Sequence, residues 1–381
     1  MALFEINTSI NTDNIQKKNC SNNDKNYTMI NYKNGMADSG GLYRSVLLDE
    51  NEKIVSFAPP KSLTLGEFCQ KHNCFNTNDY QINDIIEGTM VNLFHNGDFW
   101  EISTKGSVGG NYWYFRTCYD ENDKKQMTFR EMFIECLGYH NSTSLNDIDW
   151  VLSLPENYVY SFVMQHPDNH IVFDIEYPSI VLVSIFKKDN GKLQLEPLSA
   201  IKCWNVFENS KVFFPAEHNP KNMDFAVELA NSDLNGGVMI THLQSGDRVS
   251  IKNNEYERLK QIRGNNPNMQ YHYYSLLQSG QVQSFLDHFP KYERMFARFS
   301  KQLNDFIRNV HDAYVLYYVQ KRGKQIKIPT NIFPHIYKLH FEKRLPSLTS
   351  GENLIITKKV VSDYINGMQP KEMFYFINKV D

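Results

Sequence analysis

The hydrophobic periodicity of the chain changes once, near residue 255, and this change constrains the fold more than any other feature. From about residue 41 to 252, short apolar runs alternate with turn residues, which is typical of β-strands. Beyond Tyr256, apolar and aromatic residues recur at every third or fourth position, which is typical of packed helices. The turn-forming run Gly264–Asn268 lies close to the change. The sequence therefore predicts an α+β domain over 31–260 with antiparallel sheets, followed by an all-α domain over 261–381.

Paired apolar runs in the first domain predict β-hairpins. The two runs of each pair are separated by a short polar stretch. In the second pair this stretch contains Asn96-Gly97, which suits the positive φ of a tight turn. The pairs are Leu42–Leu48 with Ile54–Phe57, and Met90–Phe94 with Phe99–Ile102. Further strands are expected at Tyr158–Met164, Ile171–Ile175 and Ser179–Phe186. Residues 1–30 are rich in asparagine and are expected to form a flexible polar lead-in.

Helices are predicted from capping residues and from apolar stripes. Thr128 and Glu131 have the spacing of a capping box, so a helix should begin between them. A second helix is expected over 221–230, and an aromatic stripe predicts helices over 285–318. Short helices are expected at Thr357–Asn366 and Pro370–Asn378, the latter with proline in its first turn.

Charge is unevenly distributed along the chain. The 381 residues include 40 basic and 43 acidic residues, but residues 255–381 hold 19 basic and 11 acidic ones, a net charge of +8. The remainder carries −11. A basic domain attracts polyanions, so RNA or another nucleic acid is the expected partner. No run of about 18 apolar residues is present, so no membrane span is expected.

Several other classes of site are not supported by the sequence. The six cysteines contain no Cys-x-x-Cys pair, which argues against a closed zinc site and favours reduced thiols in a cytoplasmic compartment. No leader is expected at the N-terminus. The phosphate-loop and His-Glu-x-x-His motifs are absent. His335 and His340 are five residues apart, which is not the spacing of a helical metal pair. We therefore name no metal ligand.

Several segments resemble, in order and spacing, the phage-type and large-virus RNA ligases of the covalent nucleotidyltransferase superfamily. The resemblance covers roughly residues 35–265. Its segments are Glu87–Phe94, Trp100–Gly106, Tyr158–Phe162 with His166-Pro167 and Ile171-Val172, and Gly236–Ile240 with Arg248–Asn253 and Tyr256. Ile336–His340 and Val360–Asn366 resemble parts of the C-terminal domains of such ligases in large DNA viruses. The resemblance implies a nucleotidyltransferase fold with a cleft.

The resemblance also implies a definite chemistry. In that family a lysine in a Lys-x-Asp/Glu-Gly motif attacks the α-phosphate of ATP, and a lysine does so only when its amine is activated. Downstream carboxylates are expected to hold the ribose and Mg²⁺, and a Lys-x-Lys motif is expected to stabilise the charge of the phosphate. An active member would therefore use ATP and Mg²⁺ to join a 5′-phosphate to a 3′-hydroxyl through a lysyl-AMP.

This sequence departs from the family pattern at the charged positions. An isoleucine stands where the nucleophilic lysine is expected, although the acidic residue Glu87 and the glycine that follows it match. Hydrocarbon or neutral residues also replace two carboxylates and the first lysine of the Lys-x-Lys motif, of which only Lys252 remains. The degenerate positions are Ile85, Val163, Gly236 and Ser250. Since isoleucine cannot form a lysyl-adenylate, the leading hypothesis is a ligase-like protein that has lost covalent adenylylation.

On this hypothesis the chain acts as a nucleic-acid-binding or assembly component, in a viral setting. Candidate nucleotide- or phosphate-binding residues are Glu87, Lys105, Lys252 and Lys61, and candidate nucleic-acid-binding residues are Lys321, Arg322, Lys324 and Lys327. One alternative is an active ATP-dependent RNA ligase with a relocated lysine, for which Lys33, Lys61, Lys105 and Lys252 are candidates. A second alternative is a structural virion or protein-interaction protein. The expected location is the host cytoplasm or the virion.

Overall fold

The computed structural model describes the chain apart from residues 11, 34, 37–39, 73–78, 113–126, 233–234, 265, 323–326 and 380–381. The described residues form two compact units. We call the first, which ends at Gln261, the β unit, and the second, which starts at Ile262, the helical unit. In the described residues, no helix combines the length and the hydropathy that a membrane span requires.

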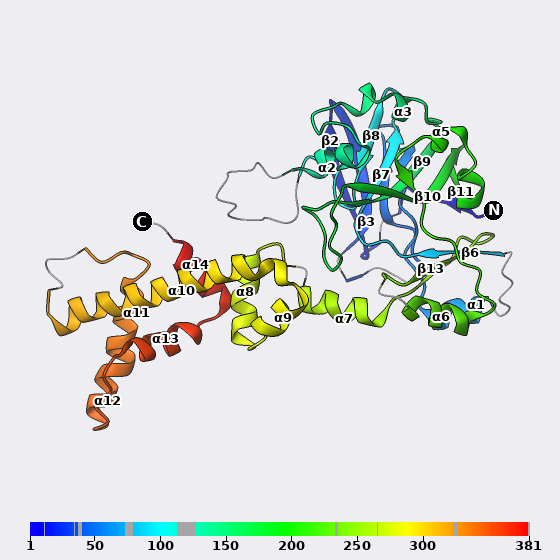
Figure 1. Cartoon of the computed structure of the whole chain (residues 1–381). Coiled ribbons are helices and arrows are strands. Elements are labelled where there is room, and N and C mark those ends of the chain that lie inside the picture. Colours follow the sequence, from blue (N-terminus) through cyan, green and yellow to red (C-terminus); the bar gives the residue numbers. More distant parts are fainter. Residues whose placement is uncertain are drawn as a thin grey trace. The chain divides into compact units, whose positions relative to one another are not determined.

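A central antiparallel sheet organises the β unit (Figure 1). Its order is β1 (Leu3–Glu5), β11 (Lys192–Glu196), β10 (Ser179–Asp189), β9 (Tyr158–Gln165), β7 (Thr89–His95) and β8 (Trp100–Ser103), and the short β12 (Val212–Phe213) pairs with β10 in parallel. Both predicted hairpins are confirmed, because β7 pairs with β8 and β4 (Arg44–Leu48) pairs with β5 (Ile54–Ser56). The sheet therefore places the start of β7 beside the end of β9.

Two smaller antiparallel sheets complete the β unit. One has the order β2 (Ile15–Asn22), β3 (Lys25–Tyr32), β4 and β5. The other has the order β14 (Arg248–Ile251), β13 (Val238–His242) and β6 (Tyr80–Asp84). Helices α1 (Leu65–Lys71) and α6 (Met223–Ser232) pack on the latter through Phe68, Ala226 and Ala230. Because β6 leads directly into β7, the three-stranded sheet and the central sheet meet at residues 85–88.

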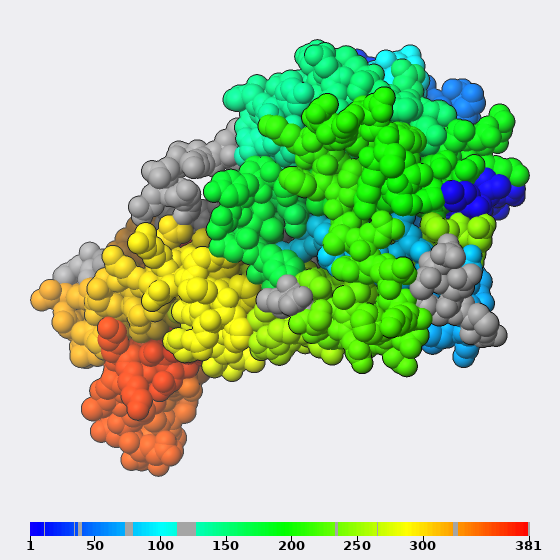
Figure 2. Space-filling model, turned by 45° about the vertical axis from the view of Figure 1, so that its right-hand side comes forward, coloured from blue at the N-terminus to red at the C-terminus, as the bar shows by residue number. Residues whose placement is uncertain are grey.

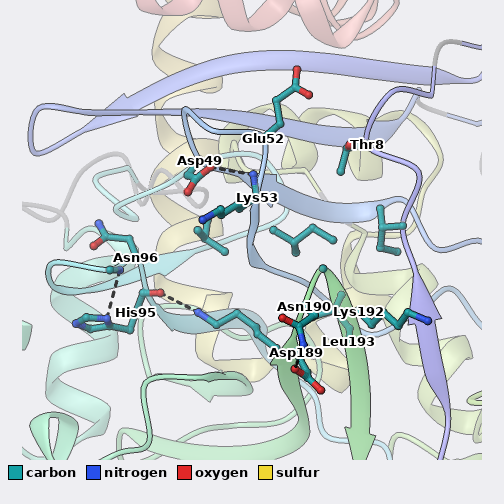
Figure 3. A pocket seen from close by; sticks show the side chains of 16 residues that line it. Thr8, Asp49, Glu52, Lys53, His95, Asn96, Asp189, Asn190, Lys192 and Leu193 are labelled. Carbon is teal, nitrogen blue, oxygen red and sulfur yellow. Dashed lines mark hydrogen bonds between the residues drawn. The ribbon is translucent and has the colours of Figure 1, made fainter.

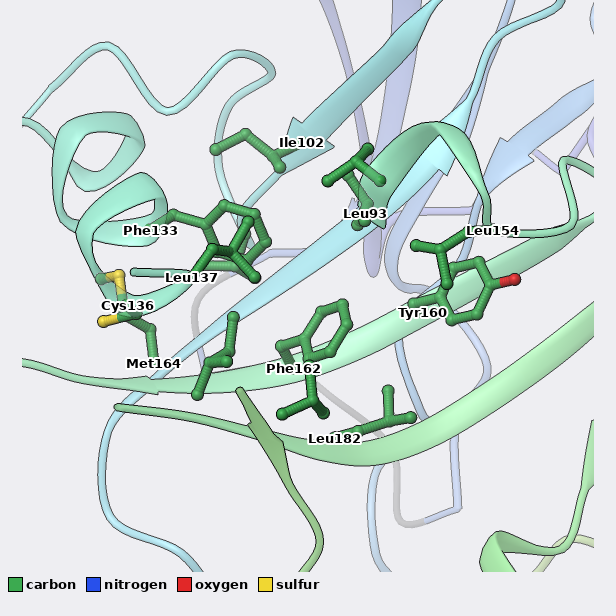
Figure 4. Close-up of a cluster of buried hydrophobic side chains, with 14 of the residues drawn as sticks. Leu93, Ile102, Phe133, Cys136, Leu137, Leu154, Tyr160, Phe162, Met164 and Leu182 are labelled. Carbon is green, nitrogen blue, oxygen red and sulfur yellow. The ribbon is translucent and has the colours of Figure 1, made fainter. Parts of the chain in front are cut away.

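The main hydrophobic core covers one face of the central sheet. The predicted capping box is confirmed, since Thr128 and Glu131 cap α2 (Phe129–Cys136) reciprocally. Figure 4 shows Phe133 of α2 and Leu137 lying over Phe162 of β9, and the rings of Phe133 and Phe162 are 5.9 Å apart. The same face is covered by η2 (Leu145–Asp147), α3 (Asp149–Leu152), α4 (Leu198–Ile201) and α5 (Asn205–Glu208).

The helical unit follows α7 (Asn254–Arg263), and its long α10 carries the predicted aromatic stripe on its buried face. The predicted α13 and α14 are confirmed, with Thr357 as the N-cap of α13 and Pro370 in the first turn of α14. The elements are α8 (Met269–Gln278), α9 (Val282–His288), η3 (Pro290–Tyr292), α10 (Glu293–Tyr314), η4 (Val315–Val319), α11 (Phe333–Lys338), η5 (Leu339–Arg344), α12 (Leu345–Thr349), α13 (Lys358–Asn366) and α14 (Pro370–Asn378).

Two predictions about secondary structure were wrong. Residues 1–30 are not a flexible lead-in: they contain β1, β2 and nearly all of β3, and Tyr27 and Met29 are buried against Phe94 and Val159. Their polar composition reflects strands that bury only one face, so that every second residue can be polar. The expected strand at Ile171–Ile175 is instead a loop.

Candidate functional site

Two of the four degenerate motif positions, Ile85 and Gly236, line one cavity of about 200 Å³ in the β unit. The cavity forms where the connection from β6 to β7 meets the start of β13, the end of β14 and the first turns of α7. Its lining residues come from four distant parts of the sequence: Ile85, Ile86, Glu87, Gly88, Thr89, Asn169, His170, Ile171, Gly236, Lys252, Tyr256, Glu257 and Lys260. We call this cavity the motif pocket.

Glu87 is fixed at the wall of the motif pocket by backbone donors. Only 6% of the residue is exposed. Its Oε1 accepts the N–H groups of Ile171 at 2.7 Å and Val172 at 3.0 Å, and its Oε2 accepts those of Val172 at 3.1 Å and Phe173 at 3.4 Å. Three consecutive N–H groups therefore point at one carboxylate. This explains why residues 171–175 are not a strand, because these donors are not available to a neighbouring strand.

Tyr256 also belongs to this arrangement. Burial raises the pKa of the Tyr256 hydroxyl, and the nearby Glu87 carboxylate, to which it is hydrogen-bonded, raises it further. The Tyr256 ring stacks on Phe173, with ring centroids 5.4 Å apart. The start of α7 and the 171–173 loop are thus both held at Glu87. Since both carboxylate oxygens already have protein donors, Glu87 is poorly placed to bind a metal ion.

Backbone atoms pack closely against two glycines of this region, Gly236 and Gly88. A Cβ atom at Gly236 would lie 2.4 Å from the carbonyl oxygen of Ile85. A Cβ atom at Gly88 would lie 2.3 Å from the carbonyl oxygen of Met164 and 2.7 Å from Cγ1 of Val163. Real Cβ atoms do not approach backbone this closely, so a glutamate at position 236 would require the backbone to move.

Two ammonium groups line the motif pocket, and they share one carboxylate. Lys252 Nζ lies 3.3 Å and Lys260 Nζ 3.7 Å from Oε1 of Glu257. Lys260 was not predicted from the sequence. It reaches the pocket because it lies one helical turn after Tyr256 on α7, and its Nζ lies 5.6 Å from the centre of the Tyr256 ring. These three side chains carry a net charge of +1, and Glu87 in the wall of the same pocket balances it.

The other candidate residues lie elsewhere. Lys105 is exposed in the turn after β8, and Lys33 is exposed after β3. Lys61 lines a different cavity, of about 280 Å³, together with Arg248. Val163 lies in β9, and Ser250 lies in β14 and pairs with Met239 of β13. Neither Val163 nor Ser250 lines the motif pocket. In the helical unit Lys321, Arg322 and Lys327 are exposed, and Lys324 lies outside the described residues.

A larger cavity, of about 960 Å³, contains none of the motif positions (Figure 3). It lies between the turns of three hairpins, those after β4, β7 and β10. Lys188 extends from β10 and donates a hydrogen bond to the carbonyl oxygen of His95 at 2.9 Å. Burial lowers the pKa of Lys188 to about 8.

The lowered pKa of Lys188 predicts a pH-dependent stability. Between pH 8 and 10 the unfolded chain keeps a proton that the folded chain releases, so the free energy of unfolding should rise with pH by about 1–2 kcal/mol because of this group. Below about pH 7 the lysine is protonated in both states and contributes almost no slope. Urea unfolding of the wild type and of Lys188→Met at pH 8, 9 and 10 measures this contribution. Parallel pH profiles for the two proteins would contradict it.

The chain was also compared with known proteins. No protein-family model matches it. It is 21% identical over 314 residues to the immediate-early protein ICP-46 homolog of Invertebrate iridescent virus 6, covering 78% of this chain and 66% of the viral protein, so it spans slightly less than two thirds of that relative.

Two solved structures with partial similarity are RNA ligases. An archaeal ATP-dependent RNA ligase matches with a TM-score of 0.42 and 11% identity, covering 74% of this chain and 71% of that one. A Naegleria gruberi RNA ligase variant with ATP and Mn matches with a TM-score of 0.35 and 10% identity, covering 48% of this chain and 51% of that one. The chain thus spans about half of the Naegleria ligase chain.

Proposed function

We propose that this chain is an RNA-ligase-like protein of the nucleotidyltransferase superfamily that binds nucleic acid and does not form a lysyl-AMP. The observation that supports the proposal is the composition of the motif pocket, which is lined by Ile85 and in which the ammonium groups of Lys252 and Lys260 face Glu257. The hydrocarbon side chain of Ile85 has no amine with which to attack phosphorus.

The size of the motif pocket supports the same proposal. Pockets that enclose a drug-sized ligand have volumes of roughly 300–1,000 Å³, and the motif pocket has about 200 Å³. It can accept a phosphate or part of a nucleotide. The residues present do not fit a resident Mg²⁺ either, because the Glu87 oxygens accept backbone N–H groups and Glu257 faces two lysines. In the described residues, no group of three or more His, Cys, Asp or Glu is arranged to hold a metal ion.

An adenylylation assay tests the loss of covalent chemistry. The full chain is incubated with ATP labelled at the α-phosphate and with Mg²⁺ or Mn²⁺, and the denatured protein is analysed on a gel. We expect no labelled band above the background of a heat-inactivated sample. A labelled protein–AMP band would overturn this part of the proposal, whichever lysine carries the label.

The second candidate function is an active ATP-dependent RNA ligase. Because Lys252 and Lys260 line the motif pocket, they are better candidates for its nucleophile than the other lysines. ATP and Mg²⁺ would then be its cofactors. This candidate predicts that Lys252→Ala or Lys260→Ala abolishes labelling, while Lys105→Ala, which changes an exposed lysine outside the pocket, leaves labelling intact.

Nucleic-acid binding is tested separately, by the salt dependence of RNA binding to the full chain. Neutralisation of several phosphates by lysine and arginine should make the affinity fall steeply as salt rises. Absence of binding at low salt would favour a structural or protein-interaction role. The similarity to an iridescent virus protein supports a viral setting, and a cytoplasmic location stays a prediction.

A further inference from the structure

Aromatic side chains gather in the helical unit where two helical segments pack against each other. The Tyr318 ring lies parallel to the His340 ring, with centroids 3.8 Å apart and an interplanar angle of 10°. Tyr337 and Phe341 lie beside them, with ring centroids 4.4 Å apart, and Phe341 meets Tyr318 edge-on at 6.3 Å. We call Tyr318, Tyr337, His340 and Phe341 the aromatic surface.

The aromatic surface is not simply part of the core. Tyr337 is 48% exposed and Phe341 44% exposed, and Phe333 nearby is 40% exposed. The buried stripe of α10 lies on other residues, among them Phe296, Phe299 and Phe306. In Figure 2 the orange segments, which include those that carry the aromatic surface, lie at the surface of the helical unit. Single exposed rings are common, but adjacent exposed rings form an apolar patch, and such patches mark binding surfaces.

Both segments that carry the surface depart from α-helical geometry. Val315–Val319 and Leu339–Arg344 are π-helical, and they contain Tyr318, His340 and Phe341. A π-helical turn is rare, and such turns occur frequently at functional sites. Here the two wide turns face each other and bring the Tyr318 and His340 rings into parallel contact.

Positive charge surrounds the aromatic surface. Residues 312–344 include seven basic and two acidic residues. Lys321 and Arg322 directly follow the first π-helical segment, and Lys338 and Lys343 lie within the turns that carry Tyr337 and Phe341. Within the part of the chain that the structure describes, these four cations are exposed and form no ion pair with a carboxylate. Their charge therefore remains available to an anionic partner.

From exposed ring faces and uncompensated cations we propose that the aromatic surface binds single-stranded nucleic acid. Bases stack on the faces of Tyr337 and Phe341, and the phosphates contact Lys321, Arg322 and Lys338. The inference rests on the nucleic-acid binding put forward under Proposed function and assigns it to one surface. A duplex keeps its bases stacked on each other, so ring faces recognise unpaired strands, and basic residues beside the rings follow the backbone.

Fluorescence polarisation of the full chain tests the inference, with a labelled oligouridylate as the single strand and a labelled RNA hairpin stem as the duplex. Stacking of one base on an aromatic ring is worth roughly a factor of 5–150 in affinity. We therefore expect Tyr337→Ala with Phe341→Ala to weaken oligouridylate binding about 10- to 100-fold. Tyr337→Phe and Phe341→Tyr should bind like the wild type, since each retains a ring.

Two control variants separate stacking from general effects. Tyr177→Ala removes a ring that is 76% exposed in the β unit and should leave binding unchanged. Lys321→Ala should weaken binding and lower the slope of log affinity against log salt by about 0.7, the contribution of one phosphate contact with a single strand. Circular dichroism of each variant monitors folding, which truncation of half-exposed rings should preserve.

The outcomes distinguish this inference from the function on which it rests. If the wild type binds oligouridylate and the double alanine variant binds equally well, the aromatic surface is not the site, although nucleic-acid binding stands. Stronger binding of the duplex than of the single strand would also overturn the inference. If the wild type binds neither RNA at low salt, the inference and the proposed nucleic-acid binding are both wrong.

Discussion

Replacement of Glu87 by alanine is expected to lower the free energy of unfolding by about 3 kcal/mol. A hydrogen bond to a charged group contributes roughly 1.5–3 kcal/mol, and Glu87 accepts bonds from the N–H groups of three consecutive residues. Partial exposure of residues 171–173 lets water replace some of these bonds, which is why the expected loss is below their sum. Urea unfolding followed by tryptophan fluorescence measures the difference.

Variants at the same pocket separate the role of Glu87 from a general effect of removing charge. Glu87→Gln keeps one acceptor oxygen but turns an NH₂ group toward backbone donors, so an intermediate loss is expected. Glu257→Ala removes a carboxylate whose side chain is 30% exposed and should cost less than 1 kcal/mol. Equal stabilities of Glu87→Ala and Glu257→Ala would contradict the proposed role of Glu87 in holding the loop.

Replacement of Arg130 by methionine is expected to cost about 3–5 kcal/mol, the range found when one partner of a buried ion pair is removed. Arg130 donates to Glu101, which is fully buried and also accepts hydrogen bonds from Asn22 Nδ2 at 2.6 Å and Asn23 Nδ2 at 3.0 Å. Methionine removes the only cation paired with Glu101 among the described residues. The uncompensated carboxylate then stays buried beside β2 and α2.

A surface ion pair supplies the matched control for Arg130. Arg258 and Glu255 form an exposed i,i+3 pair on α7, so Arg258→Met should leave the free energy of unfolding close to that of the wild type. Adding Glu101→Leu to Arg130→Met should recover part of the loss, because the double variant has no buried charge. If Arg130→Met lowers the free energy of unfolding no more than Arg258→Met does, the buried pair does not stabilise the fold more than a surface pair.

The local elements were predicted well where the determinants lie close together in sequence. The capping box at Thr128 and Glu131, the two hairpins and α14 depend on hydrogen bonds and turn conformations within a few residues. Residues 1–30 were predicted wrongly because their burial depends on strands from other parts of the chain. Likewise, the strand expected at Ile171–Ile175 is a loop because its N–H groups bind a carboxylate more than 80 residues away.

By itself, the sequence determined that position 85 holds an isoleucine, that the C-terminal part is basic and that a strand-rich part precedes a helical part. Only the tertiary structure decided that Lys260 joins Lys252 at Glu257, that Glu87 holds the 171–173 loop and that two π-helical turns bring Tyr318 onto His340. The physical reason is the separation in sequence over which each kind of interaction acts. Periodicity and capping act between residues a few positions apart, whereas a pocket or a ring stack exists only after distant segments have packed and their charges and faces have met.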